Sequence, residues 1–352
     1  MRMPSAGIAL CQSQFDTAAQ HMLRLEVSRR TFLQLAAGAA ALPAASRGWA
    51  QTYPSRPITI VIPFPPGGST DVIGRILSER MRPSLGQSVV IENVGGANGS
   101  IGAGRVARAA PDGYTLIIGN WNNFVANGAL YTLPYDLLND FKPIALLSEN
   151  PLLLAARKKM PAQDLKEFIT WLKANPNKAT EGHAGLGSVG HVAGYFFQKV
   201  TGTHFEFVPY RGGGPSVQDL VAGNIDFVMN SATDSMQQVR AGSVKAFAVT
   251  ANRRLSGLPE IPTVDEAGLP RFYFSQWFGL WAPKQTPDNI IRRLNDAVVD
   301  ALADPEIHSR VADVGQEIYP RERQTPEALA ALHRAEIDKW WPIIKEANIK
   351  GE

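Results

Sequence analysis

The chain has 352 residues, of which 45% are hydrophobic, and a formal net charge of +3 from 35 basic and 32 acidic side chains. Residues 1–50 hold five of the arginines and two of the acidic residues, so the remainder, with 30 of each kind, carries no net charge. That balance argues against nucleic acid or an anionic membrane as a partner. The single cysteine, Cys11, lies in the same fifty residues, and a thiol-free remainder fits an oxidising compartment without disulfides.

Residues 1–50 resemble an export signal of the twin-arginine type. The sequence Ser-Arg-Arg-Thr-Phe-Leu-Gln at 28–34 precedes a mildly apolar stretch at 35–42, and Gly-Trp-Ala predicts cleavage near Ala50. The alternative is a chance arginine pair beside an alanine-rich run, and Met22 is an alternative start. The apolar stretch is much shorter than the about 18 residues that span a bilayer. We therefore expect a periplasmic protein.

In the remaining chain, short apolar strands alternate with amphipathic helical stretches. The first series has the order strand, helix, strand, helix, strand, which implies a mostly parallel sheet flanked by helices. Its strands are expected at 58–62, 89–93 and 115–119, and its helices at 72–85 and up to residue 109.

A second series of the same kind follows, and we expect it to form a sheet of its own. An aromatic strand and two long helices then return the chain to the first sheet. The expected strands are at 152–156, 205–210, 225–229, 246–250 and 274–283, and the helices at 165–174, 192–200, between 210 and 225, 288–302 and 326–347.

Two crossings between the sheets predict two lobes joined by a hinge. The chain leaves the first sheet near 149 and returns near 272. Lobe 1 is therefore expected at 51–148 and 272–352, and lobe 2 at 149–271.

The most informative joint is the glycine-rich turn after the strand 58–62. Gly67 and Gly68 allow close backbone approach, Ser69 can cap the next helix, and the amides at its start favour an anion. A tight connection would explain this turn equally well, but small and amide residues recur at other strand ends, where open α/β sheets bind ligands. The recurrences are at 120–123, 185–191, 211–216 and 230–234.

Three alternative sites are weaker. The sequence 185–190 has the spacing G-x-G-x-x-G of a dinucleotide site, but the preceding stretch 178–184 is polar rather than a buried strand. The clustered histidines lack carboxylates or thiols at metal-ligand spacing. Ser188 and His191 could form a nucleophile and base, but no third member is evident, so we expect Ser188 to cap a helix and His191 to support the loop.

Two further side chains suggest how a ligand is held. Arg211 could clamp a carboxylate through two hydrogen bonds, with an ion pair between lobes or at the surface as the alternative. Trp121 lies between Asn120 and Asn122, which argues against a buried strand position. We therefore expect Trp121 to line the cleft and to stack on an aromatic or extended apolar ligand, and Trp277 to pack in the core.

Five motifs, in order along the chain, resemble the Bug family, the periplasmic solute receptors of tripartite tricarboxylate transporters. They are YPSRPITIVIPFPPGGSTD at 53–71, GGANGSIG at 95–102, PDGYTL at 111–116, YRGGGP at 210–215 and WFGLWAP at 277–283. The resemblance implies a two-lobe α/β periplasmic binding protein of type II (a Venus flytrap), each lobe a mostly parallel sheet flanked by helices. It also implies no cofactor, and a small carboxylate held by the loop at 66–71 and by loops of lobe 2. At 120–122 the family commonly has small hydroxyl or glycine residues, and this departure leaves the ligand open.

We therefore expect a receptor, not an enzyme, that captures a small organic carboxylate, possesses no catalytic residue, metal or cofactor, and delivers its ligand as a monomer to membrane permease subunits. Alternatives are a ligand-sensing receptor for a signalling partner and an exported nucleotide-dependent oxidoreductase. The candidate ligand-binding residues are Pro66, Gly67, Gly68, Ser69, Asp71, Asn120, Trp121, Asn122, Gly187, Ser188, His191, Arg211, Gly212, Gly213, Asn230 and Asp234.

Overall fold

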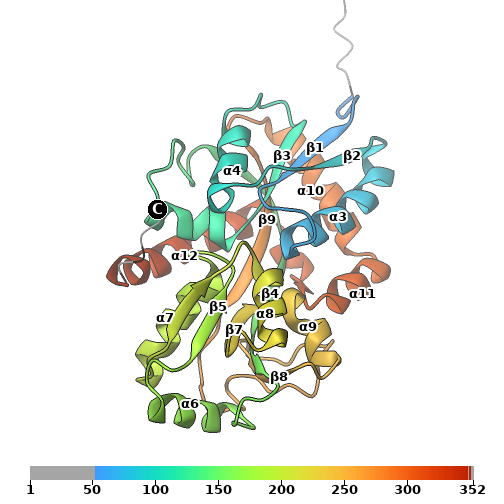
Figure 1. Ribbon diagram of the computed structural model, residues 1–352. Coiled ribbons are helices and arrows are strands. Elements are labelled where there is room, and N and C mark those ends of the chain that lie inside the picture. Colours follow the sequence, from blue (N-terminus) through green and yellow to red (C-terminus); the bar gives the residue numbers. More distant parts are fainter. Residues whose placement is uncertain (1–51, 348, 350–352) are drawn as a thin grey trace, which may run out of the picture. The chain divides into compact units, whose positions relative to one another are not determined.

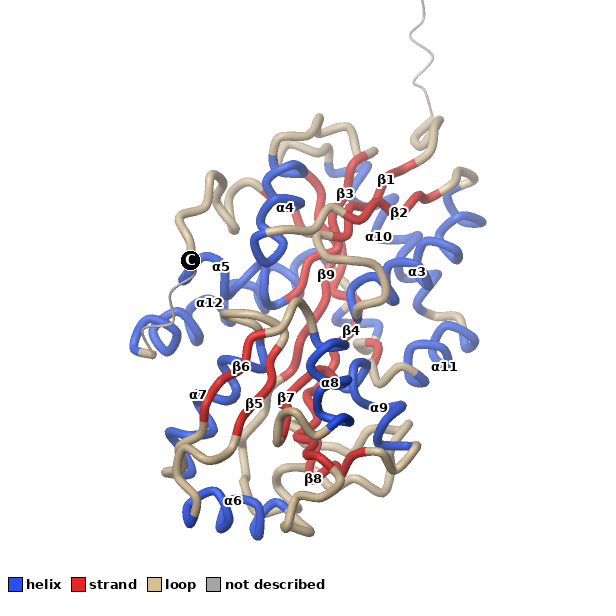
Figure 2. The backbone as a smooth tube through the Cα atoms, in the orientation of Figure 1, coloured by secondary structure: helices blue, strands red, loops and turns tan. Residues whose placement is uncertain are grey.

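The computed structural model describes residues 52–347 and residue 349 (Figure 1). The expected export signal and its cleavage near Ala50 lie outside these residues. The described strands form one mixed sheet in the order β2-β1-β3-β9-β4-β7-β5-β6, with β8 and β10 also paired to β4. Figure 2 shows them in red with helices on both sides. Among the described helices, none combines the length and the apolarity needed to cross a membrane.

One half of the sheet is built on parallel strands from the first part of the chain. Its elements are β1 (Ile58–Ile62), α3 (Ser69–Leu85), β2 (Val89–Asn93), η1 (Ala97–Gly99), α4 (Ser100–Ala107), β3 (Thr115–Asn120), η2 (Asn122–Ala126), α5 (Asn127–Leu130), β9 (Ser275–Pro283), α10 (Asp288–Leu302), α11 (Pro305–Asp313), β10 (Glu317–Ile318), η3 (Arg321–Arg323) and α12 (Pro326–Glu346). β1 pairs in parallel with β2 and β3, and β9 runs antiparallel to β3. Ile58, Ile60 and Ile62 are buried in a core shared with α3 and α10, which suits branched side chains to this strand.

The other half repeats this plan. Its elements are β4 (Phe141–Arg157), α6 (Leu165–Ala174), β5 (Thr180–His183), α7 (Val189–Thr201), β6 (Glu206–Pro209), α8 (Gly213–Ala222), β7 (Phe227–Ser231), α9 (Ala232–Arg240) and β8 (Val244–Val249). β5 lies in parallel between β6 and β7, and β4 is antiparallel to β7 and β8.

The expectation of two separate sheets is corrected by β4, which belongs to both halves. The segment Phe141 to Pro151 pairs with β9, and Leu152 to Ala156 pairs with β7. The sequence predicted only the second of these segments as strand. At Pro151 the strand exchanges partners, and proline suits this point because it has no N–H to donate to a ladder.

The polar stretch 178–184 contains a buried strand, β5, contrary to expectation. Glu181 of β5 is fully buried against Gly194 of α7, and neither carboxylate oxygen has a hydrogen-bond partner. Burial raises the pKa of Glu181 well above its ordinary value. The backbone amide of Met229 lowers this pKa only slightly, because it forms no well-aligned hydrogen bond to the carboxylate. The neutral, protonated carboxyl is therefore the form that this core tolerates.

This burial predicts that the protein loses stability as pH rises. A raised carboxyl pKa in the folded state contributes stability that is complete below the unfolded pKa of about 4.3 and is lost through the folded pKa, at about 1.4 kcal/mol per pH unit. In thermal denaturation from about pH 4.5 to pH 8, we expect Glu181→Gln to flatten this decline and to be the more stable protein at pH 8.

The matched control is Glu206→Gln, since Glu206 is exposed on the neighbouring strand β6. It should follow the wild-type curve. Parallel curves for wild type and Glu181→Gln would show that Glu181 does not carry this linkage.

Candidate ligand-binding site

A cavity of about 670 Å³ opens where the strand ends of the two half-sheets meet. Each parallel strand supplies lining from its carboxyl end or from the loop that follows it. The lining consists of residues 63–70, 96–99, Asn120, Asn122, Ala184, 188–190, 211–215, Asn230, Ser231, Asp234 and Gln276.

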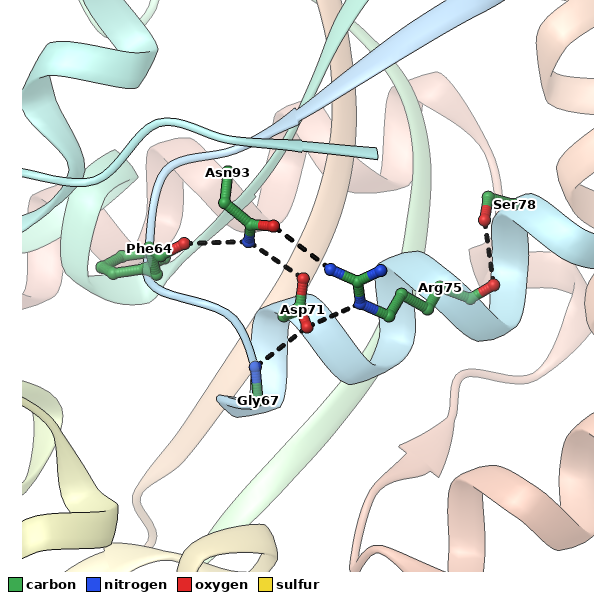
Figure 3. Close-up of polar contacts among 6 residues, drawn as sticks. All are labelled: Phe64, Gly67, Asp71, Arg75, Ser78 and Asn93. Atoms are coloured by element: carbon green, nitrogen blue, oxygen red, sulfur yellow. Dashed lines mark hydrogen bonds and ion pairs between the residues drawn. The ribbon is translucent and has the colours of Figure 1, made fainter. Parts of the chain in front are cut away.

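The first wall is the loop between β1 and α3, shown in Figure 3. Gly67 has φ +87°, a conformation that glycine adopts without strain, and its amide donates to Asp71 Oδ2 at 2.9 Å. Asp71 also accepts from Arg75 Nε at 2.8 Å and from Asn93 Nδ2 at 2.9 Å. Burial raises the pKa of Asp71, but these hydrogen bonds outweigh it and hold the pKa below its ordinary value. Asp71 therefore shapes the loop and is not among the residues that line the cavity.

Helix starts surround the cavity, and four of them have no side-chain cap. These are the starts of α3, α4, α8 and α9, whose N-cap residues are Gly68, Gly99, Gly212 and Ser231. The first amides of a helix have no partner within it and carry the positive end of its dipole, so they favour an anion. The starts of α3 and α4 lie on one half-sheet, and those of α8 and α9 lie on the other.

The fifth start, that of α7, is closed by side chains around it. Ser188 Oγ accepts from the amide of His191 at 3.3 Å, and His191 Nδ1 accepts from the amide of Gly187 at 3.1 Å. Asn122 Oδ1, from the other half-sheet, accepts from the amide of Val189 at 3.0 Å. Ser188 therefore caps α7 and His191 supports the loop, as the sequence predicted. Burial, with a smaller contribution from His183, lowers the pKa of His191 to about 3, so its ring is neutral.

Gln276, which the sequence analysis missed, joins the two walls. Its Oε1 accepts from Ser69 Oγ at 3.1 Å and from Ser231 Oγ at 2.9 Å. Ser69 begins α3 and Ser231 ends β7, while Gln276 lies near the start of β9 and is buried. The sequence feature that could have identified Gln276 is that it is the only amide side chain in the aromatic strand 274–283.

The lining contains two charged side chains, Arg211 and Asp234. Arg211 is exposed. Asp234 lies in the first turn of α9, and its carboxylate occupies the space where a Cβ on Gly213 would stand, 2.1 Å from that position. Asp234 is half-buried, and the desolvation it undergoes beside Gly213 raises its pKa to about 7.

Trp121 lies outside this cavity, contrary to expectation. Its indole is 1% exposed and meets Trp340 edge to face, with ring centroids 5.7 Å apart. It borders a separate cavity of about 320 Å³ beside α12, which Trp277 and Glu336 also line. Burial at this position is possible because Asn120 is satisfied within the protein: its Nδ2 donates to Thr70 Oγ1, and its Oδ1 accepts from the amide of Asn122.

Most of the candidates from the sequence come together at the larger cavity. Four do not line it, namely Asp71, Trp121, Gly187 and His191; the candidates that do are Pro66, Gly67, Gly68, Ser69, Asn120, Asn122, Ser188, Arg211, Gly212, Gly213, Asn230 and Asp234. The loop 96–99 also lines the cavity without having been a candidate, although its glycines are a visible sequence signal. Within residues 52–347, no group of three His, Cys, Asp or Glu side chains is placed to hold a metal ion.

Comparisons with known proteins show which family has this fold and sequence. A model of the family described as tripartite tricarboxylate transporter family receptor matches residues 73–349. BugT of Bordetella pertussis is 35% identical over 303 residues, which cover 86% of this chain and 92% of BugT.

Three solved structures share the fold over most of the chain. The periplasmic binding protein BugD is 37% identical with a TM-score of 0.77, covering 85% of this chain and 100% of BugD. MatC of Rhodopseudomonas palustris with bound malate is 39% identical with a TM-score of 0.76, covering 83% and 100%. R. palustris Rpa4515 with adipate is 33% identical with a TM-score of 0.79, covering 85% and 99%.

These matches confirm the resemblance and the two-lobe periplasmic binding fold. The matched proteins are solute-binding receptors, so neither the oxidoreductase alternative nor a nucleophile at Ser188 is supported. The chain belongs to the receptor family of tripartite tricarboxylate transporters and is a solute-binding protein of the Bug type, not an enzyme.

Proposed function

We propose that this receptor captures a small aliphatic carboxylate in the larger cavity. The observation that carries the proposal is the uncapped start of α3, which Gly67 and Gly68 leave open to a cavity of about 670 Å³. The relatives solved with malate and with adipate support the ligand class. The expected aromatic ligand loses its main support, because Trp121 faces another cavity.

The ligand contacts come from both lobes in this proposal. Gly68 and Ser69 supply backbone amides from lobe 1, and Arg211 supplies a guanidinium from lobe 2. Asn120, Asn122 and Asn230 add amide groups to the lining. Lobe 1 comprises 51–148 and 272–352 and lobe 2 comprises 149–271, with the two crossings acting as the hinge.

Delivery to membrane permease subunits by a monomeric, exported receptor completes the proposal. The family match supports a transport role, and residues 1–50 supply an export signal of the twin-arginine type cleaved near Ala50. A receptor that senses its ligand for a signalling partner would need the same closing lobes, so the site itself does not distinguish transport from sensing.

The first test is Gly68→Val, measured by titration calorimetry with malate and adipate. A Cβ on Gly68 would meet only the carbonyl oxygen of Pro65, at 4.0 Å, so the fold should tolerate the change. The valine side chain would cover the amides at the start of α3, and we expect a loss of affinity of at least about tenfold. Ala110→Val, which adds similar bulk at an exposed site, is the control. Equal affinities for both variants would remove this loop from the site.

The second test concerns Arg211. If its guanidinium binds a carboxylate, Arg211→Ala should weaken the binding of the same acids by roughly ten- to a hundredfold. Arg82→Ala, at the far end of α3 and also exposed, should bind as the wild type does. A loss below about threefold for Arg211→Ala would instead favour a surface role.

The third test concerns closure of the lobes. A ligand held by both lobes stabilises the closed form only if its affinity differs between the open and closed states. Small-angle scattering should then give a smaller radius of gyration with saturating adipate than without it. Superimposable curves, with binding verified by calorimetry, would contradict a ligand-driven clamp.

A further inference from the structure

The position of Asp234 poses a problem for a carboxylate-binding cavity. It is the one acidic side chain in the lining described above, and its carboxylate lies against Gly213 at the start of α8. The uncapped starts of α8 and α9 would otherwise favour an anion here. An ionised Asp234 would repel any ligand carboxylate that approaches this wall.

Asp234 also lacks a partner that would fix its charge. No hydrogen bond or ion pair to its carboxylate is formed within the described part of the chain, although hydrogen bonds hold other acidic groups of the molecule, such as Asp71. Two carboxylates that share one site cannot both ionise freely, so one of them keeps a proton.

We propose that the receptor takes up its carboxylate ligand together with one proton, which is held on Asp234 and donated in a hydrogen bond to the ligand. The proton comes from solvent and returns to it on release. Because protonated Asp234 is neutral, the bound ligand contributes the only negative charge on this wall, and no repulsion between two carboxylates arises. This inference rests on the proposed function and assigns the second-lobe wall of the same cavity a role in it. The raised pKa of Asp234, about 7, supports it.

Other charged groups near α9 do not supply this behaviour. α9 packs against α8, β4, β7 and β8, and β7 carries no charged residue. Arg211 is the other charged side chain on the same wall, and arginine does not lose its proton in proteins, so a pH dependence needs another group. The other charged groups on or near these elements have partners elsewhere or are exposed to solvent. Hydrogen bonds or ion pairs elsewhere hold Asp219 of α8, Lys245 of β8, Glu149 and Arg157 of β4, and Arg240 of α9. Asp313 of α11 is exposed.

The test is calorimetry with adipate between about pH 6 and pH 9, where free carboxylic acids are ionised, in two buffers of different ionisation enthalpy. For the wild type, we expect affinity to fall above about pH 7, approaching tenfold per pH unit, with uptake of close to one proton per ligand bound. Asp234→Asn keeps the shape and a donor without the charge. It should bind with an affinity that does not change over this range and with no proton uptake.

Asp219→Asn is the matched control, since Asp219 is on the adjacent helix and bonds Tyr210 and Asn224 outside the cavity lining. It should retain the wild-type pH dependence. Tight adipate binding by the wild type with a flat pH profile and no proton uptake would overturn this inference and leave the proposed function standing. Loss of binding in Asp234→Asn at every pH would also overturn it, because an ionised carboxylate would then be required. Failure of the wild type to bind any carboxylate at any pH would overturn both.

Discussion

The direction of the parallel strands decides where most of the cavity lining of this molecule lies. In both halves of the sheet, each parallel strand ends at the cavity, and the chain must turn there to enter a helix. Those turns place glycine, serine and asparagine at the strand ends, and they aim helix amides at one point. Much of the cavity wall is thus backbone, and the hydrogen bonds of Gln276 and Asn122 connect its two halves.

A site of this kind suits a family with varied ligands. The relatives were solved with malate and with adipate, acids of different length, on the same fold. Backbone amides at helix starts recognise a carboxylate whatever it is attached to, so discrimination has to come from the few charged and amide side chains in the lining. In this chain the charged ones are Arg211 and Asp234.

The sequence predicted the strand ends well because turn chemistry is local. Gly67 and Gly185 mark positive φ, and the pattern is visible without knowing the fold. The main error was to expect that polar residues stay exposed. The asparagines beside Trp121 and the polar residues of β5 are buried instead. Asn120 is buried because Thr70, brought near by folding, accepts from its Nδ2, while the amide of the nearby Asn122 donates to its Oδ1. A sequence does not reveal a distant partner such as Thr70. The sequence also did not predict that β4 runs through both halves, because Pro151 interrupts its apolar strand pattern.

The long β4–β9 pairing also bears on how the chain folds. β9 closes the first half-sheet by pairing with β3 and β4, yet the whole second lobe lies between them in the chain. Until residues 275–283 are made, β3 has an open edge, whereas the strands of the second half-sheet pair among themselves and with the end of β4. Loop closure over that span slows the last step. A chain interrupted before β9 would thus expose an unpaired strand edge in its first half, and such edges promote association with other chains.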